Sequence, residues 1–215
     1  MPFLKLINEW EHKSYDGIQG TKNLIYYIFQ PSKTAIDMIR PLPVLVDYGG
    51  CEPFIFPRIY ETSPEHILDY FVTNNSIFHK CNTKDIAKHR LVSFSPADYV
   101  LPFDVNQLGR LIINYYAAQG YIAAFAVHLD TYHLHLHIAV NAISYANGNR
   151  FHIVNEYTKL QMIMKKWFEE HMEMIDSSYV TKEKYENVLF GDSINPYGKT
   201  AISVKSQMWN VSHMV

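Results

Sequence analysis

Cysteine is scarce in this chain, with two among 215 residues, Cys51 and Cys81. Neither lies in a CxxC pattern of the kind that binds metals, and although the two could pair in principle, free thiols are the default in a reducing compartment. Long apolar runs are also missing, since the longest have the length of a strand and a bilayer requires roughly 20 residues. The N-terminal sequence has no signal-peptide core. We therefore expect a soluble, cytoplasmic protein.

Positively and negatively charged residues are nearly equal in number, which gives a net charge of −2 at neutral pH. This balance argues against a protein that coats duplex DNA non-specifically, but it allows a local cationic groove. Internal repeats, low-complexity blocks and glycine-rich phosphate loops are also absent from the sequence. The chain does contain 48% hydrophobic residues and many aromatics, which is enough for one globular domain with a substantial core.

The densest group of chemically active residues is HLDTYHLHLHIAVN, residues 128–141. Side chains alternate along a strand, so His133, His135 and His137 share one face while the intervening leucines share the other. If the chain folds back between this strand and the apolar segment before it, His128 lies opposite His135. Directly opposed residues are close enough to bind one metal ion together.

Three neutral imidazoles suit a borderline divalent metal and leave coordination positions open for substrate and water. Asp130 is placed to hold the second ring nitrogen of a histidine ligand. The alternative is that these histidines are polar residues on the solvent face of an antiparallel strand. Because a plain solvent face mixes Lys, Glu and Thr rather than repeating His, we favour the metal site.

Five segments have the pattern of strands and four have the pattern of helices. The expected strands lie near residues 3, 90, 122, 134 and 150, and the expected helices begin near Thr21, Ser63, Asp104 and Glu156. This order predicts an α+β fold with a five-stranded, mainly antiparallel sheet, helices packed on one face and the histidines on the other. We place the folded domain at residues 1–176 and expect residues 177–215 to be a tail or a short helical extension.

Three stretches of the chain resemble the relaxases of the mobilisation-nuclease family, in the order found in that family. They are NLIYYIFQPSKT, then HRLVSFSP ahead of a helix, then HLDTYHLHLHIAVN followed by an NG hairpin, and together they span about Thr21 to Phe168. The resemblance implies an HUH endonuclease that nicks a transfer origin for conjugative mobilisation. In such enzymes three histidines hold a divalent metal, Mg or Mn, while a tyrosine attacks the scissile phosphate and forms a 5′-phosphotyrosyl intermediate.

The resemblance also implies roles for individual residues. Tyr27 is the favoured nucleophile because it precedes an aliphatic residue and stands a few residues before Lys33, and the adjacent Tyr26 is its rival. A phenol is a poor nucleophile near its free pKa of about 10, so a neighbouring group must help to remove its proton. The metal ligands are His128, His135 and His137, the candidates for proton removal are Asp130 and His133, and the candidate phosphate contacts are Lys33, His89, Arg90 and Arg150.

The expected partner is single-stranded or hairpin DNA at a transfer origin, since aromatic side chains stack on unpaired bases without a strongly basic surface. The resemblance adds accessory relaxosome proteins and a coupling protein, and no membrane. A module that binds the origin without cutting remains an alternative. A rolling-circle replication initiator of the same superfamily is another, although those proteins carry the tyrosine after the histidines. A zinc hydrolase is disfavoured because the chain has no HExxH motif.

Overall fold

The structure is a computed structural model that describes residues 2–11, 13–30, 63–95, 98, 100–128 and 133–177. The elements in chain order are β1 (Phe3–Leu6), α1 (Ile7–Trp10), α2 (Gly17–Ile28), α3 (Pro64–Ile77), β2 (Ala87–Phe94), α4 (Pro102–Ala118), β3 (Ala123–His128), β4 (Leu134–Asn141) and α5 (Glu156–Ser177). The segment 178–215 of the expected tail lies outside the described residues, as does Cys51, whereas Cys81 is a free thiol.

The strands form one antiparallel sheet in the order β1-β2-β4-β3, so β4 is central. β3 and β4 pair with His128 directly opposite His135, which confirms the reversal expected between these two segments. On β2, Leu91 lies opposite His137. The α+β class is therefore confirmed, and the register gathers histidines from neighbouring strands on one face of the sheet.

The prediction of a fifth strand near residue 150 is wrong for this part of the chain. Residues 143 and 150 form a single isolated bridge, and the residues after Arg150 do not continue it. The reason is the position of β4, because β2 pairs with one of its edges along the whole strand and β3 pairs with the other edge over residues 135–140. A strand that follows β4 in the sequence has no edge of β4 left to pair with.

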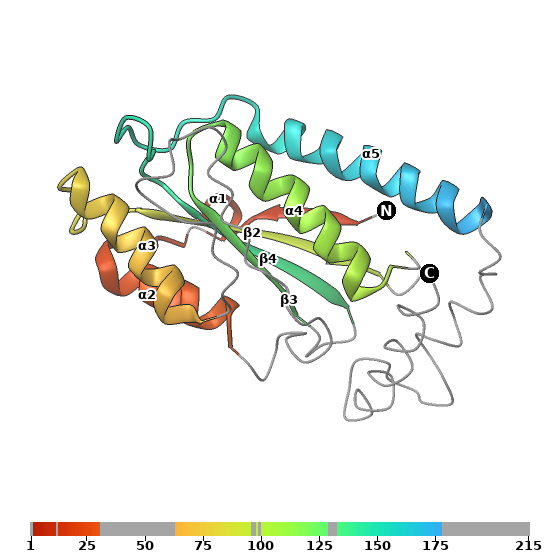
Figure 1. Ribbon diagram of the computed structural model, residues 1–215, viewed down its shortest axis with the longest axis horizontal. Coiled ribbons are helices and arrows are strands. Elements are labelled where there is room, and N and C mark those ends of the chain that lie inside the picture. The colour runs from red at the N-terminus through yellow and green to blue at the C-terminus, as the bar shows by residue number, and fades with distance from the viewer. Residues whose placement is uncertain are drawn as a thin grey trace.

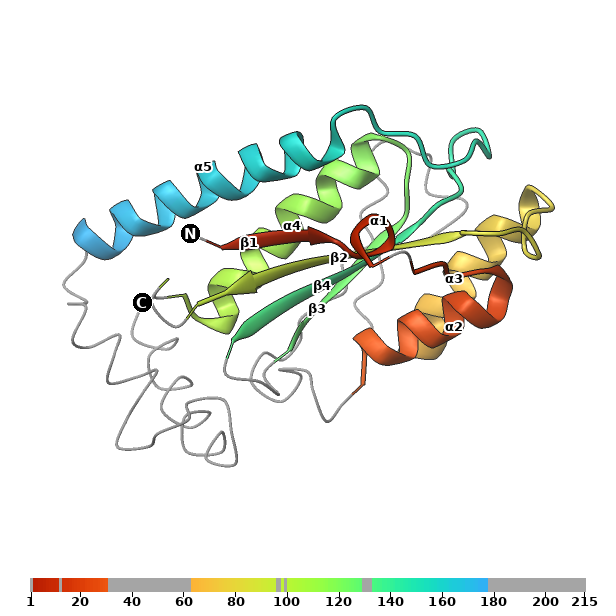
Figure 2. The same cartoon turned by 180° about the vertical axis from the view of Figure 1, so that it is seen from behind.

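The prediction that the helices pack on one face is also wrong, because helices cover both faces of the sheet. α4 and α5 pack on one face against large residues such as Val92, Leu136 and Ile138. α2 and α3 pack on the histidine face, where small residues including Ala124 and Ala139 leave room for them. Figures 1 and 2 show α4 and α2 on opposite sides of the strands. This second layer brings Tyr27 of α2 to the histidine face.

The first residues of the helices agree with the expected helix starts to different degrees. α3 begins after Ser63 with Pro64 in its first turn, as expected. α2 begins earlier than expected, at Gly17, and the Thr21 hydroxyl donates to the Gly17 carbonyl inside the helix at 3.1 Å instead of capping it. α4 begins at Pro102, and Asp104 accepts a hydrogen bond from the Leu101 backbone N–H at 2.7 Å. Within the described residues, none of the helices combines the length and apolar character that a bilayer crossing requires.

Gly109 allows α4 to approach the sheet closely. A Cβ at this position would lie 2.5 Å from Phe125 Cε2, and the Phe125 ring is buried on β3. We expect Gly109→Ala to lower the free energy of unfolding by roughly 1–2 kcal/mol, because overpacking outweighs the gain in helix propensity. Urea denaturation followed by circular dichroism measures this. Gln107→Ala, at an exposed position of the same helix, is the control, and equal stability of the two variants would contradict the steric explanation.

Candidate active site

Four elements bring one tyrosine and four histidines together on the α2 side of the sheet. His89 comes from β2, His128 from β3, and His135 and His137 from β4. Tyr27, on α2, lies over this group. Its ring centroid is 5.4 Å from that of His137, 5.8 Å from His128 and 6.1 Å from His89, each in an edge-to-face arrangement. The phenol is 43% exposed, so it sits where buried imidazoles meet solvent.

His137 is the centre of the group. Its ring centroid lies 4.1 Å from that of His128, 5.2 Å from His89 and 5.9 Å from His135. His89, His128 and His137 are buried, whereas His135 is partly exposed. The site therefore contains imidazoles from three adjacent strands. His135 and His137 share a face, as the strand alternation predicted, and the reversal between β3 and β4 brings His128 to them.

His128 ties the end of α2 to the sheet. Its Nε2–H donates to the backbone carbonyl of Ile28 at 2.7 Å, because a carbonyl can only accept. Ile28 is the residue after Tyr27 and the last residue of α2. This hydrogen bond fixes the distance between the helix end and β3, and so it holds the Tyr27 side chain over the histidines.

His89 has a partner on each ring nitrogen. Nε2 lies 2.9 Å from His137 Nδ1, and Nδ1 lies 3.1 Å from the Tyr15 hydroxyl. Burial lowers the pKa of His89 to about 3, with smaller contributions from the cations Lys13 and Arg90, so its imidazole is neutral at pH 7. Burial also raises the pKa of Tyr15 to about 12, so this phenol keeps its proton.

Residues 51–172, more than half of the chain, match the family model for the nuclease domain of MobA/VirD2-like relaxases. The matched residues include all four histidines that meet beneath Tyr27. This chain belongs to the MobA/VirD2-like relaxase family. The group II intron-interrupted relaxase LtrB of Lactococcus lactis subsp. cremoris, in strain MG1363 and in a second sequence of the subspecies, is 31% identical to it over 107 residues.

The aligned residues cover 47% of this relaxase-family chain and 19% of LtrB, so the chain spans about a fifth of the length of these relatives. No solved structure matches the chain. Tyr15 and Tyr27 precede the residues that match the family model. The family match therefore covers the four histidines, and the fold places Tyr15 and Tyr27 beside them.

Tyr26, the rival of Tyr27, faces a different part of this relaxase domain. Its hydroxyl donates to the Glu65 carboxylate on α3 at 2.9 Å, and this hydrogen bond raises the pKa of Tyr26. The ammonium of Lys22 lies 5.4 Å from its ring centroid. Adjacent positions on a helix are about 100° apart, so only one of the two tyrosines can face the histidines. In this structure that tyrosine is Tyr27.

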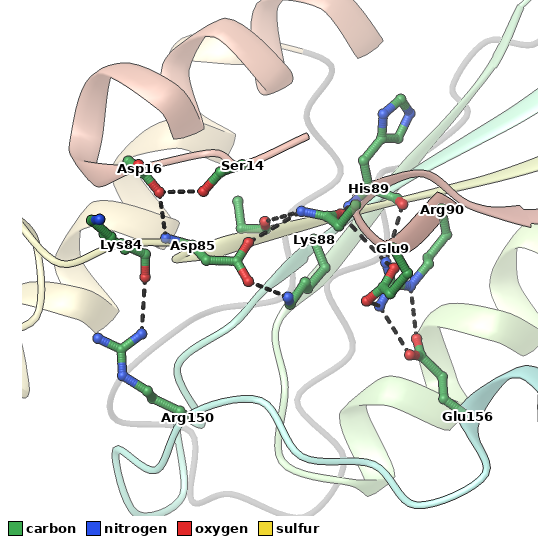
Figure 3. A network of polar contacts seen from close by, with 12 residues as sticks. Glu9, Ser14, Asp16, Lys84, Asp85, Lys88, His89, Arg90, Arg150 and Glu156 are labelled. Atoms are coloured by element: carbon green, nitrogen blue, oxygen red, sulfur yellow. Dashed lines mark hydrogen bonds and ion pairs between the residues drawn. The ribbon is translucent and has the colours of Figure 1, made fainter. Parts of the chain in front are cut away.

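Two of the expected phosphate contacts are buried. His89 is only 4% exposed and is engaged by His137 and Tyr15. Arg90 is completely buried on the opposite face of β2, where its Nε and Nη2 donate to Glu156 at 2.8 and 2.9 Å and its Nη1 donates to Glu9 at 3.0 Å. Figure 3 shows the two side chains pointing in opposite directions. Neither is available to a DNA phosphate, because the alternation of an inner strand directs both into the protein.

The remaining candidates lie at the edge of the group or beyond it. His133 is exposed, and its Nδ1–H donates to the Phe94 carbonyl at 3.1 Å, with its ring 6.4 Å from that of His135. Arg150 is exposed and donates to the Lys84 carbonyl at 2.9 Å. Lys33 and Asp130 lie outside the described residues.

The histidine cluster can also be compared with the donor set that a metal ion requires. Among the described residues, no group of three or more His, Cys, Asp or Glu side chains is already arranged around a common metal position. The donor set nevertheless fits a divalent ion chemically, because several imidazoles converge from adjacent strands and His128 lies directly opposite His135. The sequence did not predict that His89 would join this cluster. The only indication in the sequence was the face of β2 on which His89 lies. That face can be related to the histidines of β4 only when the register of the two strands is known.

Proposed function

We propose that this chain nicks one strand of DNA at a transfer origin by metal-dependent transesterification, as the relaxase step of conjugative mobilisation. The observation that carries the proposal is the position of Tyr27, whose ring lies 5.4–6.1 Å from three buried histidines in a domain of the relaxase family. A nucleophile beside a cluster of imidazoles, open to solvent on one side, is what strand transfer to a tyrosine requires.

In the proposed reaction the Tyr27 Oη attacks the scissile phosphorus. A new bond forms between Tyr27 and the phosphate, the bond from phosphorus to the 3′ oxygen breaks, and the 3′ oxygen leaves with a proton. One DNA end is then a free 3′ hydroxyl, and the other is a 5′ phosphate linked to the protein. The Tyr27 proton must pass to a neighbouring base because a free phenol has a pKa of about 10. Asp130 and His133 remain our proposals for this step.

We assign His128, His135 and His137 as the residues that would hold a divalent ion, Mg or Mn. When bound, such an ion supplies Lewis acidity that draws negative charge from the phosphoryl oxygens. The protein contributes the placement of the phosphate relative to Tyr27. The hydrogen bond from His128 to the end of α2 favours this placement, because it links a proposed ligand to the helix that carries the nucleophile.

The test uses the full chain and single-stranded oligonucleotides tiled across the transfer origin of its own genetic element. The oligonucleotides carry a label on one end or the other, and Mn²⁺ or EDTA is added before denaturing protein gels. We expect an SDS-resistant protein band that carries only the label downstream of the nick, together with a free 3′ hydroxyl on the upstream fragment.

Removal of the metal with EDTA should abolish the adduct, and restoring excess Mn²⁺ should recover it. Cleavage that leaves two free ends would disprove the tyrosine mechanism. Binding that survives EDTA with no adduct in any sample would instead identify a module that recognises the origin without cutting it. Accessory relaxosome proteins, a coupling protein and a bacterial cytoplasmic location also remain proposals that follow from this function.

A further inference from the structure

We propose that His89 is a positioning residue that fixes the tautomer and the ring orientation of His137. The inference rests on the proposed function, in which His137 is a metal ligand. The tautomer can nevertheless be measured on the protein without metal or DNA, so it is tested separately from that function. His89 lies in β2 and outside the histidine motif of β4, so its role follows from how the two strands pair.

The register places His89 beside His137 on one face of the sheet. His89 pairs with Ala139 and Leu91 pairs with His137, so the two imidazoles are diagonal neighbours. Their rings are stacked with an interplanar angle of 27° and centroids 5.2 Å apart. The 2.9 Å contact joins Nε2 of His89 to Nδ1 of His137. Both side chains are 4% exposed, so water does not compete with this contact.

On the side of β2 that faces β1, the backbone of His89 is held by a side chain rather than by a strand. The β1–β2 ladder ends at the pair Leu6 and Arg90, so β1 does not extend far enough to pair with His89. Beyond that point Asn8 accepts from the His89 backbone N–H at 2.6 Å and donates to the Ala87 carbonyl at 3.3 Å. The buried Asn8 amide thus supplies an acceptor and a donor to the β2 edge where β1 has ended.

A wider polar network surrounds this point. Asn8 Nδ2 also lies 3.2 Å from Asp85 Oδ1, and Asp85 is paired with Lys88. On the other face, Arg90 is held by Glu9 and Glu156. Figure 3 shows this network on both sides of the backbone at His89. The segment that presents the His89 ring is therefore fixed before any ligand binds.

The contact between the rings couples the tautomers of His89 and His137. One nitrogen must carry the hydrogen and the other the lone pair, since two N–H groups or two lone pairs repel. If His137 is to present the Nε2 lone pair to a metal, its hydrogen must be on Nδ1, where it donates to His89 Nε2. His89 then carries its own hydrogen on Nδ1. From there it donates to the Tyr15 hydroxyl, which lies 3.1 Å away.

The first experiment reads the tautomers directly. Long-range ¹H–¹⁵N spectra of the full chain, labelled with ¹⁵N-histidine and free of metal, distinguish Nδ1–H from Nε2–H rings. We expect Nδ1–H on both His89 and His137, with the signals assigned from the spectra of His89→Gln and His137→Gln. Tyr15→Phe removes the acceptor of the His89 hydrogen, so it should shift His89 toward Nε2–H. A His137 ring that carries its hydrogen on Nε2 in the wild type would overturn the inference.

The second experiment measures Mn²⁺ affinity by titration calorimetry. Outer-shell partners of a metal-binding histidine typically contribute roughly 10–100-fold in affinity, so His89→Leu should weaken binding by about that factor. His89→Gln retains an acceptor that reaches His137 and should recover most of the loss. This rescue separates positioning from mere packing, because leucine and glutamine are of similar size. Equal affinity of His89→Leu and wild type, or no recovery in His89→Gln, would overturn the inference.

Failure of the proposed function gives a different result. If the wild type binds Mn²⁺ and shows the expected tautomers but forms no DNA adduct, the nicking proposal fails and the role of His89 stands. If the adduct forms but His137 carries its hydrogen on Nε2, only the inference about His89 fails. Should His89→Leu not fold, the tautomers of the wild type and Tyr15→Phe, with the affinity of His89→Gln, still decide the question.

Discussion

Tyr27→Phe should eliminate the covalent protein–DNA adduct, lowering its rate of formation by at least roughly a thousandfold, because phenylalanine offers no oxygen to the phosphorus. DNA binding should change little, since the ring stays over the histidines. The measurement is the rate of the SDS-resistant shift on a single-stranded origin oligonucleotide with Mn²⁺, beside the dissociation constant from a native binding assay. A large loss of rate with unchanged binding assigns chemistry to the hydroxyl.

Tyr26→Phe is the matched control, because it makes the same change one residue away. Its hydroxyl contacts Glu65 on α3, so removing it should leave the adduct within a few-fold of the wild type. The reverse pattern, with the adduct lost in Tyr26→Phe and retained in Tyr27→Phe, would transfer the nucleophile to Tyr26. It would also require α2 to rotate away from the orientation that the His128 hydrogen bond holds.

The largest loss of stability is expected from Arg90→Leu. The Arg90 guanidinium is completely buried, and Glu156 is 8% exposed, so removal of the arginine leaves a buried carboxylate without its cation. Breaking a buried ion pair in this way typically costs about 3–5 kcal/mol. The Tyr116 hydroxyl, which donates to Glu156 at 2.5 Å, would offset only part of this. Urea denaturation of the metal-free chain, followed by circular dichroism, measures the change.

Two comparisons test the ionic explanation. Combining Arg90→Leu with Glu156→Leu removes both charges and should recover much of the lost stability, because apolar groups can replace a buried pair. Lys165→Ala breaks only an exposed pair with Glu169 and should change stability by less than about 1 kcal/mol. If the double variant is less stable than Arg90→Leu alone, then shape rather than charge determines the effect.

The sequence predicted how the histidines are arranged along and across β3 and β4, but not the layers of helices around these strands. The alternation of His133, His135 and His137 with leucines is a local pattern, because a strand has a period of two whatever lies beside it. The pairing of His128 with His135 was also predictable, since it joins two consecutive strands. Asn8 could not have been predicted, because its role depends on β1 ending one residue short of His89.

The sequence by itself determined which face of β4 carries the histidines and that a helix with two tyrosines precedes them. Only the tertiary structure decided which tyrosine faces them, that His89 joins the group while Arg90 is buried on the other face, and that no fifth strand follows β4 near residue 150. The physical reason is the range of the interactions involved. Periodicity and helix starts depend on neighbours within a few residues, whereas strand order, helix orientation and burial depend on segments tens of residues apart that meet in the folded chain.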